Sequence, residues 1–239
     1  MSFVVIIPAR YQSSRLMGKP LIKFKGVPMI VRTYMQCIKA VNKKYVYVAT
    51  DDKRIKEVCE KNNIKVVMTS KNCLTGTDRV YEASKHLHAK TYINVQGDEP
   101  LFNPKDLSKL IKEARKYPRD VITGYCEISD KKQFYDLNVP KVILSKDSFI
   151  IYASRAPVPS NKKNKFIKAW RQICAYSFPK EKLKIFYQVK KKTQIEKIED
   201  IEYLRFLELG IKLRGLKMSK KSIAVDTKED VAAVNRRLK

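Results

Sequence analysis

Residues 3–24 read FVVIIPARYQSSRLMGKPLIKF, and the change of character within this stretch decides the fold class. Phe3–Ile7 is an apolar, largely β-branched run that ends at a proline, which is typical of a strand buried on both faces. The loop that follows carries the cations Arg10, Arg15 and Lys19, and Pro28 then marks a helix start. A buried strand, a basic loop and a helix in this order indicate the first unit of an α/β fold.

The alternation of strands and helices continues along the chain. Apolar segments at 45–50, 64–68 and 92–95 are separated by stretches with apolar residues at helical spacing. This order predicts one α/β domain over residues 1–239, with a mostly parallel central sheet flanked by helices. In the second half we expect a continuous helix at 195–209 and strands at 121–125, 139–144, 149–152, 173–178 and 223–225.

Three loops are expected to meet at one edge of this sheet. Ligands of parallel sheets lie beyond the carboxyl ends of the strands, and the basic loop, the loop 69–78 and Gln96–Glu99 all follow strands. Arg10, Arg15 and Lys19 would offer phosphate oxygens forked and point-charge contacts beside a helix start. Because GxxxxGK[ST] and GxGxxG are both missing, the prediction is a polyphosphate site of another kind. The alternative is a solvated basic loop.

Two carboxylates are candidates for a metal site at the same edge. Asp98 follows a strand in NVQGDEP, and Asp226 follows another predicted strand in IAVDTKED. Mg²⁺ prefers a few carboxylates together with phosphate oxygens and water, so this pair predicts a magnesium site that neutralises a transferred phosphoryl group. The alternatives are a turn residue for Asp98 and a helix N-cap for Asp226.

Two further motifs carry polar side chains suited to a small ligand. In LTGTDR, Gly76 lets a ligand approach the backbone closely, and Thr75 and Thr77 on either side of it are small hydrogen-bonding groups. This favours contact with a base; the alternative is a helix cap. Arg155 stands beside a proline-containing loop in YASRAPVP, where it suits a substrate carboxylate; the alternative is a surface arginine.

The formal net charge of +27 raises a different function, the binding of nucleic acid. The cations are dispersed, and the sequence has no RNA-recognition signature, paired zinc-ligand motif or aromatic-and-basic platform, so this is not expected as the main role. No apolar run approaches the roughly 18–20 residues of a membrane span, and no secretory signal is expected. Five scattered cysteines without a metal or disulfide pattern fit a reducing cytoplasm.

Taken in order, six segments resemble motifs of the 3-deoxy-manno-octulosonate (Kdo) cytidylyltransferases, or CMP-Kdo synthetases: IIPARYQSSRLMGKPL, TGTDR, NVQGDEP, YASRAPVP, IEKIEDIEYLR and VDTKEDV. The resemblance covers nearly the whole chain and is weakest at residues 161–192. It implies a Rossmann-like sugar-nucleotidyltransferase fold, a smaller dimerisation and acceptor subregion at about 125–190, and a homodimer. It also implies transfer of CMP from CTP to the anomeric hydroxyl of a 2-keto-3-deoxy sugar acid, with release of pyrophosphate, for lipopolysaccharide or surface-polysaccharide synthesis.

The resemblance further assigns roles to residues at matching positions. CTP would be held by Ala9, Arg10, Arg15, Lys19, Thr75, Gly76, Thr77 and Gln96. The sugar acid would be held by Arg79, Gln96, Arg155, Gln172, Glu202 and Tyr203. Asp98 and Asp226 would ligate Mg²⁺, as a pair of ions in the ternary complex. Together with Arg15 and Lys19 they would carry catalysis through positioning and charge neutralisation.

Two departures from the family pattern concern the acceptor. Gln172 stands where the family has a histidine, and Tyr203 stands where it has a sugar-contacting glutamine. Both fall in the acceptor half, so the expected acceptor is Kdo or a related acid such as 8-amino-Kdo or a nonulosonate. The remaining alternative is a nucleic-acid-binding protein on a transferase scaffold, which the presence of Asp98 and Asp226 disfavours.

Overall fold

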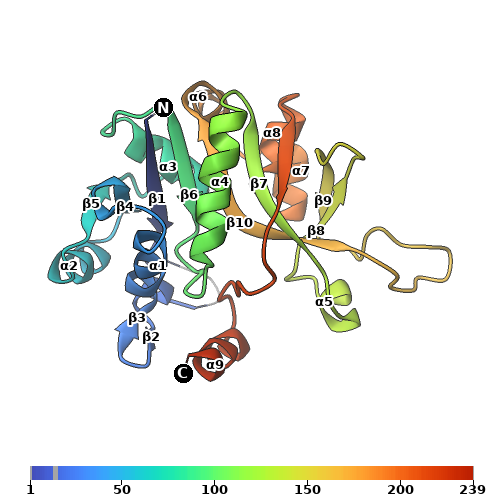
Figure 1. Ribbon diagram of the computed structural model, residues 1–239, viewed down its shortest axis with the longest axis horizontal. Helices are drawn as coiled ribbons and strands as arrows, with labels where there is room; N and C mark the ends of the chain where they lie inside the picture. Colours follow the sequence, from blue (N-terminus) through green and yellow to red (C-terminus); the bar gives the residue numbers. More distant parts are fainter. Residues whose placement is uncertain (1, 13–15, 239) are drawn as a thin grey trace.

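The computed structural model describes residues 2–12 and 16–238 of the chain. In this part of the chain, nine strands form the main sheet: β1 (Phe3–Ala9), β4 (Val46–Thr50), β5 (Lys65–Met68), β6 (Thr91–Val95), β7 (Val121–Glu127), β8 (Lys141–Leu144), β9 (Ile150–Ser154), β10 (Trp170–Pro179) and β11 (Leu213–Lys217). Their order is β11-β7-β10-β6-β1-β4-β5, and β8 joins β10 to β9 at one side. Figure 1 shows this sheet with helices on both of its faces.

The sheet is parallel except at β10 and at the antiparallel pair of β8 and β9. Strand β1 pairs in parallel with β4 and β6, and β4 pairs in parallel with β5. At the other side β7 and β11 are parallel to each other, while β10 runs antiparallel to β6, β7 and β8. The predicted α/β class with a mostly parallel sheet is therefore confirmed.

The helices of the described chain pack on the two faces of the sheet, except α5 and α9, which pack in separate small cores. They are α1 (Met29–Ile38), α2 (Lys53–Lys61), α3 (Gly76–Ser84), α4 (Pro104–Lys116), α5 (Lys131–Tyr135), α6 (Lys180–Gln188), α7 (Gln194–Glu199), α8 (Leu204–Glu208) and α9 (Lys228–Arg237). Alternate residues of β1 point to opposite faces: Val5 and Ile7 pack with α1, α2 and α4, whereas Val4 and Ile6 pack with α3, α6 and α8. Both sides of β1 are thus core, as its unbroken apolar run predicts.

A small satellite core fixes the end of the chain. The short hairpin of β2 (Lys23–Phe24) and β3 (Val27–Pro28) follows the basic loop. Phe24 and Met29 pack there against Val225 and Val234, so that α9 lies beside this hairpin (Figure 1). This packing carries the segment before α9 to the carboxyl edge of the sheet.

Two predicted elements of the second half are wrong. The helix expected at 195–209 is broken into α7 and α8, because Asp200 takes a left-handed conformation with φ 49° and ends α7. Residues 223–225 form no strand. Among the described residues, one backbone hydrogen bond joins them to the sheet edge: Val225 N donates to Asp98 O at 2.9 Å. The expected strand at 173–178 is part of the longer β10, while β11 and α4 have no counterpart in the prediction.

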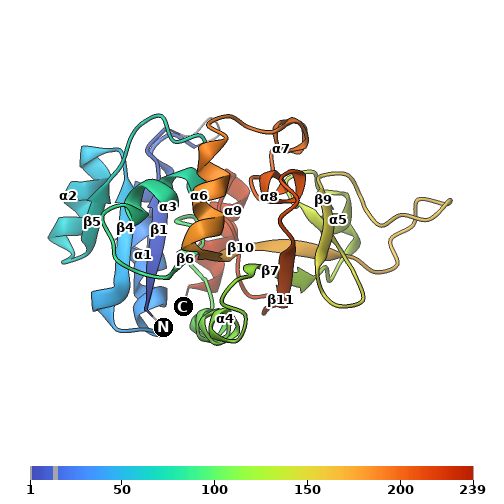
Figure 2. The same ribbon diagram turned by 90° about the horizontal axis from the view of Figure 1, so that it is seen from above.

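Part of the predicted subregion at about 125–190 extends away from the main body. Figure 2 shows α5, β9 and the loop before β10 on the side opposite to β5. Its role in dimerisation stays a prediction. Within residues 2–12 and 16–238, no helix is long and apolar enough to cross a bilayer. All five cysteines are free thiols.

Candidate functional site

A single ammonium group joins the two predicted metal ligands. The Lys19 Nζ lies 2.7 Å from Asp98 Oδ2 and 3.1 Å from Asp226 Oδ1, and all three side chains are partly buried. These residues are 79 and 207 positions apart in sequence, yet they meet beyond the carboxyl end of β6. The convergence of the basic loop with both carboxylates at this edge is the arrangement that the sequence predicts.

Local backbone geometry explains why the three side chains meet. Gly97 lies so close to the end of β1 that a Cβ there would be 2.7 Å from Pro8 O, which only glycine avoids. Val225 N donates to Asp98 O at 2.9 Å and fixes the neighbouring segment. The cap of α9 is Thr227, whose side chain accepts from Asp230 N, so the alternative of Asp226 as this N-cap is wrong.

The charges of Lys19, Asp98 and Asp226 suit the binding of a further cation beside the Lys19 ammonium. Burial lowers the pKa of Lys19, but attraction to Asp98 and Asp226 outweighs this effect and raises the pKa above the ordinary value, so the ammonium stays charged. Asp98 Oδ1 is buried and has no hydrogen-bond partner among the described residues. Two carboxylates within reach of one cation, with an unused oxygen, match the donor set that Mg²⁺ takes when substrate phosphates and water complete its shell.

Beside this group, Gln96 and Glu202 connect the sheet to α3. Gln96 Nε2 donates to Glu202 Oε1 at 2.9 Å, and Thr77 N donates to Glu202 Oε2 at 3.1 Å. Burial is the main cause of the raised pKa of Glu202. A Cβ on Gly76 would lie 2.6 Å from Gln96 Nε2, so the glycine leaves room for this amide. Thr75 is the N-cap of α3, as the alternative predicted; its contact with a base stays a prediction.

An ion cluster that the sequence analysis missed supports the same loop. Arg205 is fully buried; it binds Glu196 through Nε and Nη2, both at 2.7 Å, and its Nη1 lies 2.9 Å from Asp78 Oδ1. Asp78 in turn accepts a hydrogen bond from Thr75 Oγ1 at 2.7 Å. The cluster therefore joins α3 to α7 and α8. The available signal was Asp78 in the first turn of a predicted helix, which indicates a partner without naming it.

The two departures from the family pattern lie around one tyrosine. Gln172 Nε2 donates to the hydroxyl of Tyr176, and the ring of Tyr203 meets the Tyr176 ring edge-on with centroids 6.4 Å apart. Tyr176 was also missed, although it lies four residues after Gln172 on β10. The hydroxyl of Tyr203 and both polar atoms of the Asn94 side chain are buried without a hydrogen-bond partner among the described residues. This side of the sheet thus has unused hydrogen-bonding capacity.

Two arginines assigned to the sugar acid are already engaged by the protein. Arg79 is buried; its Nη2 lies 3.2 Å from Asp51 Oδ2 and its Nη1 donates to Thr69 Oγ1. The Arg155 guanidinium donates to the backbone carbonyls of Glu199, Leu137 and Asp200 at 2.6–3.0 Å. Direct contact with a substrate would require these bonds to be given up, so the geometry supports a structural role for both.

Ala9, Arg10 and Lys19 lie around the end of β1. Ala9 is the buried last residue of β1, and Arg10 is exposed directly after it. Arg15 lies outside the described residues. Lys19 begins a short 3₁₀ turn, Lys19–Leu21, after Gly18, which takes φ 65° and bonds to Tyr11 O at 3.0 Å. The glycine therefore sets the direction in which the lysine leaves the loop.

Comparison with known proteins places these observations in a family. The family model described as "Cytidylyltransferase" matches residues 4–218. A relative from Arabidopsis thaliana, the mitochondrial 3-deoxy-manno-octulosonate cytidylyltransferase, is 35% identical over 236 residues, which are 97% of this chain and 81% of that protein. The 8-amino-3,8-dideoxy-manno-octulosonate cytidylyltransferase of Shewanella oneidensis is 35% identical over 244 residues, covering 100% of this chain and 99% of the relative.

A solved structure agrees with this assignment. The chain is similar to CMP:2-keto-3-deoxy-manno-octonic acid synthetase complexed with CTP, with a TM-score of 0.91 and 31% identity over 100% of this chain and 98% of that one. HddC from Yersinia pseudotuberculosis, at 17% identity and a TM-score of 0.74, shares the fold. The chain belongs to the cytidylyltransferase family, as its motifs predicted, and it is therefore a nucleotidyltransferase.

Proposed function

We propose that this enzyme transfers CMP from CTP to the anomeric hydroxyl of Kdo or its 8-amino counterpart and releases pyrophosphate, as a step toward a surface polysaccharide. The observation that carries the proposal is the meeting of Lys19 with Asp98 and Asp226 at the carboxyl edge of the sheet. A cation and two carboxylates at that edge suit a nucleoside triphosphate with its metal. The similarity to a synthetase solved with CTP supports the choice of nucleotide.

The chain's own residues act on CTP mainly by charge and position. Lys19 carries a stable positive charge next to the place where phosphates would lie, and it neutralises charge that builds up as pyrophosphate leaves. Asp98 and Asp226 would hold Mg²⁺, which when bound supplies charge neutralisation at the transferred phosphoryl group. The Gly76 segment and Gln96 border the same space and orient the nucleotide and acceptor for in-line attack.

The acceptor side is formed by Glu202, Gln96 and two tyrosines. Tyr176 lies on β10, and Tyr203 lies directly before α8. Glu202 is held by Gln96 and by the first turn of α3, so its carboxylate has a fixed direction in which to accept a hydrogen bond from a sugar hydroxyl. Kdo and 8-amino-Kdo enzymes are equally similar to this chain, at 35% identity. The two acids differ at one substituent, a hydroxyl or an amine, and both remain within the proposal.

The test is pyrophosphate release by the purified full-length protein with Mg²⁺, each of the common nucleoside triphosphates, and Kdo, 8-amino-Kdo or a nonulosonate. We expect release with CTP alone among the nucleotides and with one of the octulosonates. Release with CTP and only the nonulosonate would retain the nucleotide assignment and contradict the acceptor. Omission of Mg²⁺ should abolish turnover, and full activity in the presence of a chelator would contradict the metal assignment.

We also propose that the enzyme is a homodimer through the projecting subregion. Leu137, Ile151 and Ile198 are 61%, 58% and 74% exposed. Leu137 O accepts a hydrogen bond from Arg155, Ile198 precedes Glu199 on α7, and Ile151 lies on β9. Exposed apolar side chains on neighbouring segments of a strongly charged protein favour an interface there. Light scattering on the purified protein tests the oligomeric state directly.

A further inference from the structure

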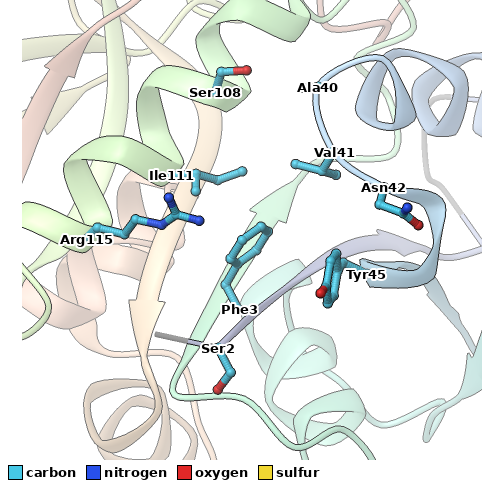
Figure 3. A pocket seen from close by; sticks show the side chains of 9 residues that line it. All are labelled: Ser2, Phe3, Ala40, Val41, Asn42, Tyr45, Ser108, Ile111 and Arg115. Atoms are coloured by element: carbon cyan, nitrogen blue, oxygen red, sulfur yellow. The ribbon is translucent and has the colours of Figure 1, made fainter.

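A groove at the amino-terminal end of the sheet brings together aromatic and basic side chains from separate parts of the chain. Its volume is about 500 Å³, and its lining residues include Phe3, Tyr45 and Arg115. Figure 3 shows the rings of Phe3 and Tyr45 next to each other, with the Arg115 side chain directed at Phe3 from α4. The ring centroids are 5.6 Å apart, and the Arg115 guanidinium lies 5.8 Å from the Phe3 ring.

Arg115 is the one cation among the groove's lining residues, and further basic residues flank the groove in sequence. None of its lining residues is an aspartate or glutamate. The segments that frame it, 39–45 and 108–116, carry seven lysines and arginines and one glutamate. Lys44 lies 5.0 Å above the Tyr45 ring, and neither Lys44 nor Arg115 forms an ion pair with a carboxylate in residues 2–12 and 16–238. These cations are therefore available to an anionic partner.

We propose that this groove binds single-stranded RNA, as a second activity separate from CMP transfer. Sequence-independent binding of single strands combines a positive groove that follows the backbone with exposed aromatic rings on which bases stack. Tyr45 is 39% exposed, so part of its side chain is accessible to a base.

The groove lies far from the catalytic group. Phe3 begins β1, whereas Lys19, Asp98 and Asp226 lie beyond the carboxyl ends of β1 and β6. At about 3.3 Å per residue, the length of β1 alone separates the two places by roughly 20 Å. RNA in the groove and CTP in the catalytic site would therefore bind independently. This separation also distinguishes the groove from phosphate contacts made by the catalytic loop.

The test is fluorescence anisotropy of the full chain with a labelled oligouridylate of about 12 nucleotides, within the site sizes typical of single-strand binding. Tyr45→Leu keeps an apolar side chain and removes the ring, and it should weaken binding by about 5-fold to 100-fold. Arg115→Ala should reduce the slope of log affinity against log salt by about 0.7, the contribution of one phosphate contact. The matched control is Arg236→Ala, which removes an exposed helical arginine elsewhere and should change neither quantity.

Two further arms complete the test. Saturating CTP should leave RNA binding unchanged, and Asp98→Asn should bind RNA like the wild type. Inorganic polyphosphate, which has charge without bases, should compete poorly. The proposal is overturned if binding is not saturable, if Tyr45→Leu binds as tightly as the wild type, or if CTP displaces the RNA. It is also overturned if polyphosphate competes as well as RNA at equal phosphate concentration, because the rings would then contribute nothing.

Discussion

Removal of the Arg205 side chain tests how much the buried ion cluster contributes to the fold and to the site. Arg205 is fully buried, and its guanidinium is the shared partner of Glu196 and Asp78, whose side chains are 0% and 4% exposed. The Phe186 ring lies 3.8 Å from the guanidinium and excludes water from its face. In Arg205→Met the side chain keeps much of its volume, but two buried carboxylates lose their counter-charge.

The size of the effect follows from this uncompensated charge. Breaking a buried ion pair by removing one partner costs about 3–5 kcal/mol. For a chain of this length, each kcal/mol lowers the melting temperature by about 2–4 °C, so the expected decrease is about 6–20 °C. Replacing the whole cluster is far less costly than removing one member. The triple variant Arg205→Met, Asp78→Asn, Glu196→Gln should therefore recover about half of the loss or more.

The assay is urea unfolding followed by circular dichroism, on the wild type, the single variant, the triple variant and Arg205→Lys. The lysine variant keeps the charge but cannot reproduce the forked contact with Glu196, so it should lie between the wild type and Arg205→Met. A loss below about 1 kcal/mol in Arg205→Met would equal that of an exposed ion pair and would refute the reasoning. A triple variant no more stable than the single variant would refute it equally.

Three other predictions concern the proposed catalytic edge of the sheet and the proposed dimer interface. Asp98→Asn should reduce Mg²⁺-dependent pyrophosphate release by about 100-fold or more while circular dichroism stays unchanged, because it removes charge rather than core; near-normal turnover would contradict the metal assignment. Gly76→Ala should displace the Gln96 amide and raise KM for the sugar acid with little change in stability. Gly97→Ala would place its methyl group against the backbone carbonyl of Pro8 and should lower the melting temperature. The reverse pattern would disprove the roles given to these two glycines. Ile151→Asp should shift the protein from dimer to monomer in light scattering, and an unchanged mass would place the interface elsewhere.

The parallel half of the fold was predictable because the apolar residues of each strand and helix there follow a clear pattern. Phe3–Ile7 is apolar at every position, and the helices that follow repeat at helical spacing. In the second half of the chain the prediction failed where tertiary contacts override the sequence pattern. The apolar stripe at 195–209 continues through Asp200, but the left-handed turn there is stabilised by its surroundings, including the Lys192 Nζ contact with Asp200 Oδ1 at 2.7 Å. Strand β11 has only alternating weak signals, LRGLK, and forms because β7 is beside it.

The site was predictable to the extent that topology decides it. Asp98 and Lys19 each follow the carboxyl end of a parallel strand, so their meeting follows from the strand order alone. The surroundings of Arg79 and Arg155 could not be foreseen in the same way. Asp51 comes from the loop after β4, and the acceptors of Arg155 are backbone carbonyls that any residue could supply. No residue type in the sequence marks such partners.

The antiparallel strand β10 also separates two parts of the molecule that could change independently during evolution. The loops proposed to bind CTP follow strands on one side of it, where neighbouring strands share one direction. Gln172 and Tyr176 lie on β10 itself, and β10 pairs with β8 of the projecting subregion. Substitutions on β10 and beyond could therefore reshape part of the proposed acceptor side without moving the loops proposed to bind CTP. A lineage could in this way change its sugar acid through substitutions on and beyond β10 while keeping the same nucleotide.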